Sequence, residues 1–451
     1  MTLPATEPLV SDPFYPQLKQ HLIEATGLAY YADKSEDLAR RVRRRLSSLG
    51  LRDCASYMNV LRDSLRGPAE WDALIAEITI CETHMFRHAE QFDALRDLVL
   101  PDLIARNGSR RRLRIWSAGC ATGAETYSMA ILLKRELAHL VPGWDVTILG
   151  TDINRQCLAQ AREGRFDEWT FRATPQELKR DCFLKEGNSW KISPEYKEGV
   201  SFQYHNLVEH SFPSLVNNLS AFDLIACRNV MIYFGPELMQ KMIGQFHDCL
   251  VPDGWLLVGP AEPNMTYFTS FRTVNAPGVT LYQKGGQEAA KEVPFVYRDI
   301  PSLLPPPVTM QRAASESAQP SLAEVRQQAD RGEWEKSARS CERLLKKDNL
   351  NPAVHFYHGL ILEQMNRPAE AERSLRRAIY LDRQFIMAHY HLGLFLQDRG
   401  DPRRAVRSFE NVLELLDRQG GAGTITGGDG ITAAELKQSA RLHVEALRER
   451  G

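Results

Sequence analysis

The sequence has almost no net charge, which excludes a long-range attraction of the whole chain to nucleic acid or to an acidic membrane surface. Its 56 lysines and arginines nearly balance 57 aspartates and glutamates, for a formal net charge of -1. It also lacks an apolar run as long as a membrane span, and it begins without the basic-then-apolar order of a secretory signal. We therefore expect a cytoplasmic protein that neither inserts into membranes nor binds nucleic acid.

Closely spaced cysteine pairs are missing as well. The cysteines show no CxxC pair and no zinc-type spacing, so we expect reduced and mostly buried thiols. His84 and His88 lie one helical turn apart, but no third ligand follows at a suitable spacing, so no metal site is predicted. The eight cysteines stand at positions 54, 81, 120, 157, 182, 227, 249 and 341.

A glycine turn predicts a nucleotide-binding crossover. The run from Leu113 to Ser128 reads as a short apolar strand, a tight turn from Gly119 to Gly123, and a helix. The turn lacks the second glycine that lets a dinucleotide fingerprint approach a pyrophosphate, and Glu125 at the helix start would repel phosphate. A ligand with a nucleoside and a cationic head, such as S-adenosylmethionine, fits this turn better.

A second strand ends in an acidic residue. Val146–Gly150 is followed by Thr151 and Asp152, roughly thirty residues after the first turn, where a carboxylate can accept hydrogen bonds from a ribose. Alone, Asp152 is equally compatible with a helix cap before Ile153. Together with the glycine turn, at this spacing, it indicates adenosine binding.

Four motifs together resemble one family. They are Thr83–Arg87, Gly119–Ser128, Gly150–Asp152 and the octapeptide Cys227–Phe234. In these motifs the chain is similar to the CheR family, the S-adenosylmethionine-dependent methyltransferases of chemotaxis receptors. The similarity covers roughly residues 12–285, and the octapeptide is its most specific part.

The resemblance implies an α/β, doubly wound S-adenosylmethionine-dependent methyltransferase fold, with an N-terminal helical subdomain at 12–80 and a catalytic domain at 81–285. Inside the catalytic domain we expect a small antiparallel β flap at about 165–200, and residues 183–192 read as a hairpin turning at Gly187–Asn188. Further strands are expected at 200–204, 222–226, 255–258, 271–274 and 279–282, the last two as a closing antiparallel pair.

The resemblance also implies the site residues. Arg87 and Tyr233 correspond to groups beside the reacting methyl. Plainer alternatives exist: Arg87 could be a surface cation and Tyr233 a core residue. Thr83, one of the implied cofactor contacts, could be a helix cap. Cys81 departs from the asparagine usual in the family. The implied cofactor contacts are Cys81, Thr83, Arg87, Glu125, Asp152, Asn206, Leu207, Arg228 and Asn229.

Carboxyl methylation constrains the catalytic needs. A glutamate side chain is roughly 99% ionised at pH 7, so a carboxylate nucleophile needs no strong general base. Catalysis must come from aligning the carboxylate oxygen, the methyl carbon and the sulfur, and from excluding water. An arginine that holds the carboxylate and a tyrosine near the methyl group suit this task.

An arginine-rich helix is expected near the N-terminus. Apolar residues at 38, 42, 46 and 49 recur at helical spacing and predict a buried stripe, with arginines on the remaining arc. In the family, a basic helix faces receptor methylation helices rich in Glu and Gln, and Arg41 and Arg44 look like its docking residues. A solvated face is the plainer alternative; nucleic-acid contact lacks the usual interleaved aromatics.

The remainder of the chain predicts a linker and helical repeats. Residues 286–320 are rich in proline and indicate a semi-extended linker. Residues 321–417 repeat at a period of 34, for example at Ser337, Ala371 and Ala405, and resemble tetratricopeptide repeats. A helix within 431–451 could cap the last repeat. Such repeats present a surface to a protein or peptide, whose identity the sequence does not reveal.

The sequence thus favours a protein-glutamate O-methyltransferase that uses S-adenosyl-L-methionine, releases S-adenosyl-L-homocysteine, and forms methyl esters on the cytoplasmic methylation helices of a chemoreceptor. Alternatives are a small-molecule carboxyl methyltransferase and a catalytically decayed repeat scaffold. The receptor, its modified glutamates, the signalling output, the oligomeric state and the effect of Cys81, Ala124 and Thr126 on activity stay open.

Overall fold

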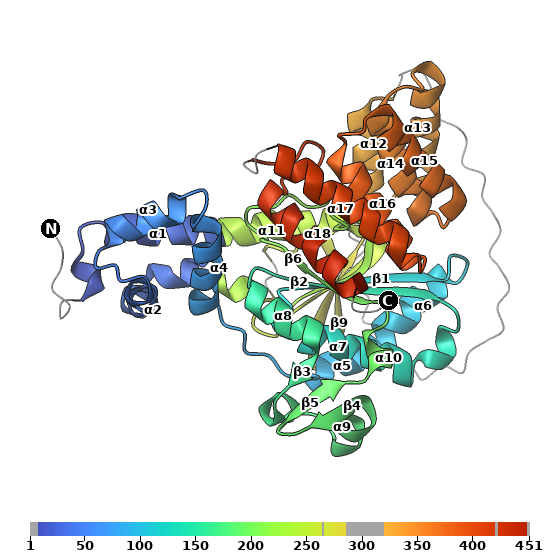
Figure 1. The fold of residues 1–451 in the computed structure, drawn as a ribbon. Coiled ribbons are helices and arrows are strands. Elements are labelled where there is room, and N and C mark those ends of the chain that lie inside the picture. Colours follow the sequence, from blue (N-terminus) through green and yellow to red (C-terminus); the bar gives the residue numbers. More distant parts are fainter. Residues whose placement is uncertain (1–7, 264–265, 286–319, 420–422, 449–451) are drawn as a thin grey trace. The chain divides into compact units, whose positions relative to one another are not determined.

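A computed structural model describes residues 8–263, 266–285, 320–419 and 423–448, and the chain divides into two compact units (Figure 1). The first comprises residues 1–287 with 428–431, and the second comprises 288–427 with 432–451. Nearly all of the expected proline-rich linker, 286–319, lies outside the described residues. Within the described ranges, every helix is too short or too polar to cross a membrane.

The first unit begins with a helical part whose core is built from amphipathic faces. Leu38, Val42 and Leu46 of the predicted stripe are buried, but Leu49 is 41% exposed because it lies one residue past the end of its helix. Tyr31 fixes the last helix by donating its hydroxyl to the Ile78 carbonyl at 2.6 Å. The helices are α1 (Tyr15–Thr26), α2 (Ser35–Ser48), α3 (Cys54–Arg62) and α4 (Gly67–Ile78).

A seven-stranded sheet follows, in the order β6-β2-β1-β7-β8-β10-β9. β6, β2, β1, β7 and β8 pair in parallel, and β10 pairs antiparallel with both β8 and β9. This is the doubly wound fold with a closing antiparallel pair that the sequence predicts. The strands are β1 (Arg112–Ala118), β2 (Asp145–Asp152), β6 (Val200–Tyr204), β7 (Phe222–Cys227), β8 (Leu250–Val258), β9 (Phe271–Ala276) and β10 (Val279–Lys284).

Two apolar layers cover the faces of this sheet. Alternate residues of β1 point to opposite faces: Leu113 and Ile115 pack with one cluster, Trp116 and Ala118 with the other. The first cluster includes residues of α5, α6 and α7, and the second includes residues of α11. These helices, with one more beside β2 and β6, are α5 (Ala89–Ala94), α6 (Leu100–Asn107), α7 (Ala124–Ile131), α8 (Arg155–Glu163) and α11 (Pro236–Cys249).

The predicted flap is a separate three-stranded antiparallel sheet, in the order β3-β5-β4. The hairpin turns at Gly187–Asn188 as predicted, with Gly187 at φ 61°. Phe166, Phe171 and Phe183 form the apolar interior beneath it. Its elements are β3 (Arg165–Phe166), α9 (Gln176–Cys182), β4 (Phe183–Glu186), β5 (Ser189–Ile192) and the adjoining α10 (Pro194–Lys197).

The second unit is helical, and small residues explain its period. A Cβ added at Gly359 would lie 2.8 Å from the Leu375 side chain, and one at Gly393 would lie 2.8 Å from Phe409. Paired helices can therefore approach only where these positions stay small. The helices are α12 (Leu322–Asp330), α13 (Trp334–Lys347), α14 (Pro352–Gln364), α15 (Pro368–Leu381), α16 (Ile386–Asp398), α17 (Pro402–Arg418) and α18 (Ala433–Arg448).

The last helix covers the end of the repeats. The His443 ring of α18 stacks on Phe409 with centroids 4.8 Å apart, and Tyr390 and Ser439 share a hydrogen bond of 2.7 Å between their hydroxyls. Leu436 and Ala440 of α18 are fully buried. The helix expected within 431–451 therefore closes the apolar edge of the last repeat.

Candidate active site

A cavity lies at the carboxyl ends of β1, β2 and β7, where a doubly wound sheet binds its ligands. Its walls come from the helical part, the segment 78–87, and the loops that follow the three strands. Cys81 is the one implied contact that does not line it. The implied residues that do line it are Thr83, Arg87, Glu125, Asp152, Asn206, Leu207, Arg228, Asn229 and Tyr233.

The glycine turn forms one wall of the cavity. Gly119 has φ 76°, and a Cβ there would lie 2.4 Å from the Val230 side chain, so both backbone conformation and space require glycine. The amides of Gly119 and Cys120 donate to the Thr151 carbonyl at 2.8 and 2.9 Å, which binds the turn to the end of β2. These two hydrogen bonds fix the position of the turn at the cavity wall.

Asp152 is not the cap of the next helix. Asn154 caps α8, because its side-chain oxygen accepts from the amides of Gln156 and Cys157. The Asp152 carboxylate instead accepts from the amides of Ala121 and Asn154, each at 2.8 Å. Burial raises the pKa of this carboxyl, and the amide hydrogen bonds oppose the rise. The carboxylate lies beside the glycine turn and lines the cavity, and its ribose role stays a prediction.

A buried ion pair joins β7 to α7. The Glu125 carboxylate accepts from the Ser117 hydroxyl at 2.7 Å and from Arg228 Nη1 at 2.8 Å. The Arg228 side chain is 2% exposed, and its Nε donates to Gln91 Oε1 at 2.6 Å. Its Nη2 donates to the Arg87 carbonyl and lies 3.0 Å from His88 Nδ1.

Arg228 therefore acts mainly through its neighbours. Burial lowers the pKa of the Arg228 guanidinium, while Glu125 opposes that change. Its donors are committed to Glu125, Gln91, the Arg87 carbonyl and the His88 ring. The sequence predicts that Arg228 contacts the cofactor. The structure shows in addition that Arg228 holds the Glu125 carboxylate and the Arg87 backbone in position.

Arg87 and Tyr233 lie at the same cavity. Among the residues that the structure describes, the Arg87 guanidinium has no hydrogen-bond or ion-pair partner, although its carbonyl is held by Arg228. The Tyr233 ring packs edge-on against Tyr30, with centroids 5.9 Å apart. Burial raises the pKa of the Tyr233 phenol and the Arg87 charge opposes that shift, so the phenol stays neutral at neutral pH.

Three further predicted residues take distinct positions. Thr83 lines the cavity and does not cap α5, whose N-cap is His88. Asn206 is buried, and its Nδ2 donates to the Ala25 carbonyl at 2.9 Å, which joins the end of β6 to the helical part. Leu207 adds an apolar surface that is 8% exposed.

Glu262 is a site residue that sequence reasoning missed. Its carboxylate accepts from the amides of Asn229 and Val230 at 2.9 Å, from Ile232 at 3.3 Å, and also from Gly259. It thus fixes the turn that carries Asn229, which has φ 59°, and presents Tyr233. A glutamate three residues after Gly259 was visible in the sequence, but nothing there located its partners.

We expect Glu262→Gln to lower kcat about 10- to 100-fold, because the turn loses a charged acceptor and small shifts of reacting groups are costly. Steady-state kinetics would measure this, with near-ultraviolet circular dichroism to verify folding. The matched control is Glu237→Gln, since Glu237 is exposed at the start of α11. Unchanged kcat in a folded Glu262→Gln variant would contradict the role.

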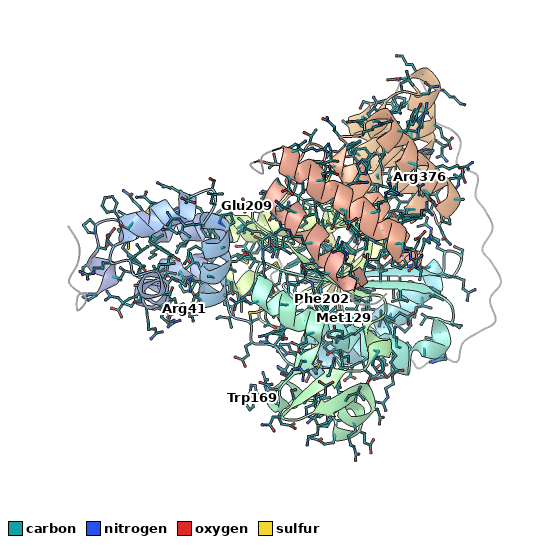
Figure 2. The ribbon with its side chains drawn as sticks, viewed as in Figure 1. Arg41, Met129, Trp169, Phe202, Glu209 and Arg376 are labelled. Atoms are coloured by element: carbon teal, nitrogen blue, oxygen red, sulfur yellow. A yellow bond between two sulfur atoms is a disulfide. The ribbon has the colours of Figure 1, made fainter. Side chains whose placement is uncertain are left out.

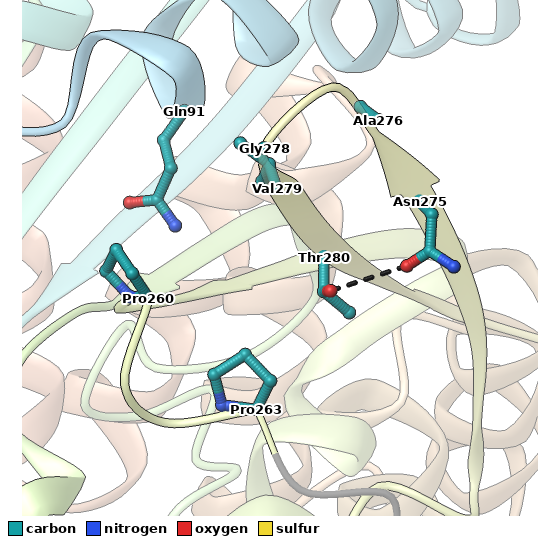
Figure 3. A pocket seen from close by; sticks show the side chains of 8 residues that line it. All are labelled: Gln91, Pro260, Pro263, Asn275, Ala276, Gly278, Val279 and Thr280. Atoms are coloured by element: carbon teal, nitrogen blue, oxygen red, sulfur yellow. Dashed lines mark hydrogen bonds between the residues drawn. The ribbon is translucent and has the colours of Figure 1, made fainter.

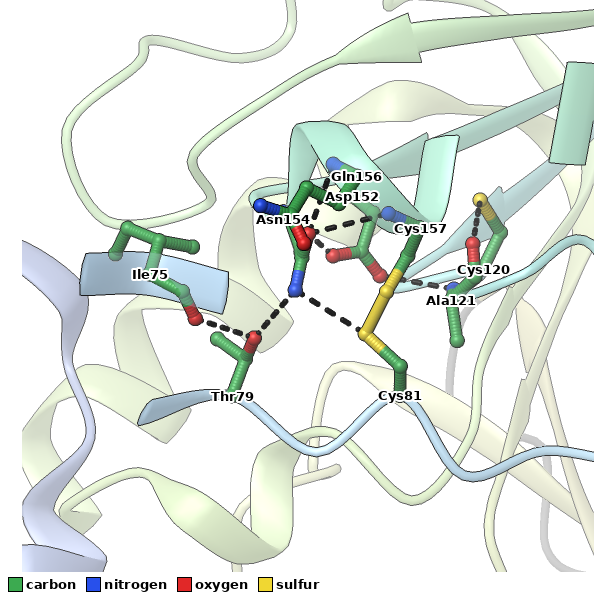
Figure 4. The surroundings of a disulfide bond; sticks show 9 residues. All are labelled: Ile75, Thr79, Cys81, Cys120, Ala121, Asp152, Asn154, Gln156 and Cys157. Atoms are coloured by element: carbon green, nitrogen blue, oxygen red, sulfur yellow. Dashed lines mark hydrogen bonds between the residues drawn. A yellow bond between two sulfur atoms is a disulfide. The ribbon is translucent and has the colours of Figure 1, made fainter. Parts of the chain in front are cut away.

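The expectation of reduced cysteines is wrong for one pair. Cys81 and Cys157 form a disulfide, with Cα atoms 6.5 Å apart, and this occupies the sulfur of Cys81 (Figure 4). The sequence gives no local sign of this pair because 76 positions separate the two residues. The free cysteines at 54, 120, 182, 227, 249 and 341 are buried, as expected.

A second cavity is lined in part by Gln91, the residue that contacts Arg228 of the ion pair. Gln91 connects the two regions, because its Oε1 accepts from Arg228 while its Nε2 donates to the Val258 carbonyl at 2.6 Å. Thr280 donates to Asn275 Oδ1 at 3.3 Å across the closing hairpin. The cavity is lined by Gln91, Pro260, Pro263, Asn275, Ala276, Gly278, Val279 and Thr280 (Figure 3).

The predicted docking arginines lie on α2 of the helical part. Arg41, which Figure 2 labels, is only 23% exposed, and it contacts Asp37 at 3.2 Å and the Glu77 carbonyl at 2.5 Å. Arg44 is 51% exposed and pairs with Glu77 at 2.8 Å. Arg44 is therefore the more accessible of the two.

The donors and acceptors of the cavity fit S-adenosylmethionine. Asp152 would offer a ribose acceptor, and Glu125 would supply negative charge near the cationic head while Arg228 offsets part of it. The side-chain oxygen Asn229 Oδ1 is buried without a hydrogen-bond partner among the described residues. An ammonium group in the cavity would satisfy such an orphan acceptor.

Comparison with known proteins identifies three regions of the chain. The CheR methyltransferase SAM binding domain matches residues 81–278, the CheR methyltransferase all-alpha domain matches 15–79, and a tetratricopeptide repeat matches 388–422. These matches agree with the sheet, the helical part and the repeats described above.

Similar proteins extend this agreement. The chemotaxis protein methyltransferase of Escherichia coli (strain K12) is 33% identical over 292 residues, covering 62% of this chain and 94% of that protein. The same-named protein of Borreliella burgdorferi is 34% identical over 235 residues, covering 51% and 81%. The probable biofilm formation methyltransferase WspC of Pseudomonas aeruginosa is 27% identical over 384 residues, covering 79% and 88%. The chain therefore belongs to the CheR family of S-adenosylmethionine-binding methyltransferases.

Proposed function

We propose that this enzyme forms methyl esters on glutamate side chains of a chemoreceptor. The observation that carries the proposal is Arg87, a guanidinium with no described partner, in the same cavity as the neutral phenol of Tyr233. Such a cation suits an incoming carboxylate, because arginine donates two parallel hydrogen bonds to it. The names of the relatives from Escherichia coli and Borreliella burgdorferi support a chemotaxis protein as the substrate.

The chain supplies position and environment. When bound, S-adenosylmethionine provides an electrophilic methyl group on a positively charged sulfur. Arg87 would hold the glutamate carboxylate, and Tyr233 would border the methyl group and exclude water from that side. Glu125 and Asp152 would orient the cofactor. No side chain has to remove a proton, because the nucleophile is already a carboxylate at neutral pH.

The chemical test is release of the transferred group by mild base. The chain would be supplied with methyl-labelled S-adenosylmethionine and a receptor cytoplasmic fragment containing candidate glutamates. A glutamate ester predicts volatile labelled methanol after base treatment. Label that resists base, as on nitrogen, would overturn the proposed reaction while leaving cofactor binding intact.

We further propose that the basic face of α2 docks the acidic methylation helices. Arg44→Ala and Arg41→Ala should each raise KM for a receptor fragment about two- to fivefold at low salt, since exposed charge contacts are weak and screened. The effect should shrink as ionic strength rises. The dissociation constant of S-adenosylhomocysteine should not change.

The matched control for docking is Arg66→Ala, because Arg66 is 74% exposed and belongs to the same helical part. Its replacement should leave KM unchanged at every salt concentration. Equal loss of receptor use and cofactor binding in the Arg41 and Arg44 variants would show that these arginines only support the fold.

The repeats are proposed to recruit a partner protein or peptide rather than to take part in transfer. One specific observation gives a second candidate for the signalling output: the relative that aligns along 79% of this chain is named for biofilm formation. Deleting the gene in its source organism and measuring swimming and surface attachment separately would distinguish this output from chemotaxis.

A further inference from the structure

The disulfide lies at the wall of the cofactor cavity. Cys81 belongs to the segment that leaves α4, and its sequence neighbours on both sides, Ile80 and Glu82, line the cavity. Cys157 is the third residue of α8, the helix that begins just after Asp152. The bond therefore ties one wall of the cavity to the helix beside the predicted ribose acceptor.

Hydrogen bonds extend this tie to the carboxylate itself (Figure 4). Asn154 Nδ2 donates to Thr79 Oγ1 at 2.8 Å and contacts Cys81 Sγ at 3.2 Å. The amide of Asn154 donates to Asp152 Oδ1 at 2.8 Å. Asn154 thus connects Cys81 to the carboxylate of Asp152, which lines the cavity.

The two sulfurs differ in ways that favour exchange. Cys81 is partly exposed, whereas Cys157 is 5% exposed. Attack by an external thiolate is therefore expected at Cys81 rather than at Cys157, which would leave as a thiolate. Cys157 lies in the first turn of α8, where the helix dipole favours the departing thiolate, while its burial opposes the charge.

We infer that Cys81 and Cys157 form a thiol–disulfide exchange site that sets the affinity of the cavity for its cofactor. The reagent class is a small dithiol in one direction and a small disulfide in the other. A dithiol attacks Cys81 Sγ, its second thiol resolves the mixed disulfide, and two thiols remain on the protein while the reagent is oxidised to its disulfide. The inference rests on cofactor binding and not on the proposed receptor substrate.

The expected direction follows from pre-organisation. In the disulfide form the segment that contains Ile80 and Glu82 is covalently held at the cavity. After reduction this segment gains freedom that cofactor binding must remove, so affinity should fall. Reduction should therefore weaken binding of S-adenosylhomocysteine by at least about threefold.

The experiment uses the intact wild-type chain, so it does not depend on a variant that folds. Calorimetric titrations with S-adenosylhomocysteine would be made after equilibration with oxidised glutathione and, separately, with dithiothreitol. Alkylation under denaturing conditions followed by mass spectrometry would count free cysteines in each sample. The expected result is two fewer alkylated cysteines, a linked pair of peptides containing Cys81 and Cys157, and tighter binding in the oxidised sample.

Variants assign the effect to this pair. Cys157→Ser should remove the difference between the two conditions, whereas Cys341→Ser, a buried cysteine of the repeats, should retain it. Equal affinity of the wild type in both states would overturn the inference, as would failure of the linked peptide to form. Since neither readout involves a receptor, either failure is distinct from absence of glutamate methylation.

Discussion

Replacing Arg87 with alanine is expected to lower kcat/KM for methyl transfer about 100- to 1000-fold, the range seen when one charge-stabilising donor is removed from an active site. Affinity for S-adenosylhomocysteine should fall far less. The fold should be unaffected, because the Arg87 guanidinium has no hydrogen-bond or ion-pair partner among the described residues. Steady-state kinetics with a receptor fragment, together with calorimetry, separates the two effects.

Two variants sharpen this test. Arg87→Lys keeps a positive charge but loses the planar pair of donors, so it should recover only part of the lost rate. Arg106→Ala removes a surface arginine that pairs with Asp102 at 2.9 Å, and it should have no effect on transfer. A folded Arg87→Ala enzyme with full kcat/KM would show that substrate is held elsewhere.

Replacing Arg228 with alanine should have the largest effect on stability. It would leave Glu125 buried without its cation, and removal of one member of a buried ion pair costs about 3–5 kcal/mol in the free energy of unfolding. It would also release Gln91 and the Arg87 carbonyl. Denaturant unfolding measures the loss, and cofactor binding should fall with it.

The control for Arg228 is Arg96→Ala, because Arg96 is 37% exposed and pairs with surface carboxylates. Its loss should cost less than about 1 kcal/mol. In a double-mutant cycle, Glu125→Gln combined with Arg228→Ala should cost less than the sum of the single changes. An additive cycle, or a loss under 1 kcal/mol for Arg228→Ala, would mean that the pair is not coupled.

The sequence predicts most of the fold because buried residues recur along a strand, a helix or a repeat at a regular spacing. The short apolar strand from residue 113 and the hairpin at 183–192 are readable within a few residues. The helical repeats are readable for a related reason: Gly359 and Gly393 recur at the period because larger side chains would collide with Leu375 and Phe409. Each of these signals depends on neighbours close in sequence or at a fixed interval.

The rest of the site depends on contacts between distant segments. Cys81 and Cys157 meet only after the helical part has packed against the sheet, so their spacing alone indicates two free thiols. Glu262 binds amides about thirty residues earlier in the chain. Tyr30, from the helical part, likewise contacts a residue far along the chain, because its ring packs against that of Tyr233. The motifs contain half of the residues that line the cavity, but they do not indicate which contacts hold that lining in place.

Titration of the folded chain with S-adenosylhomocysteine tests the central claim most directly. The account predicts saturable heat with one molecule bound per chain, and competition by S-adenosylmethionine for the same site. A chain with native circular dichroism that gave no heat with either compound would contradict the claim that the cavity at the ends of β1, β2 and β7 holds the methyl donor.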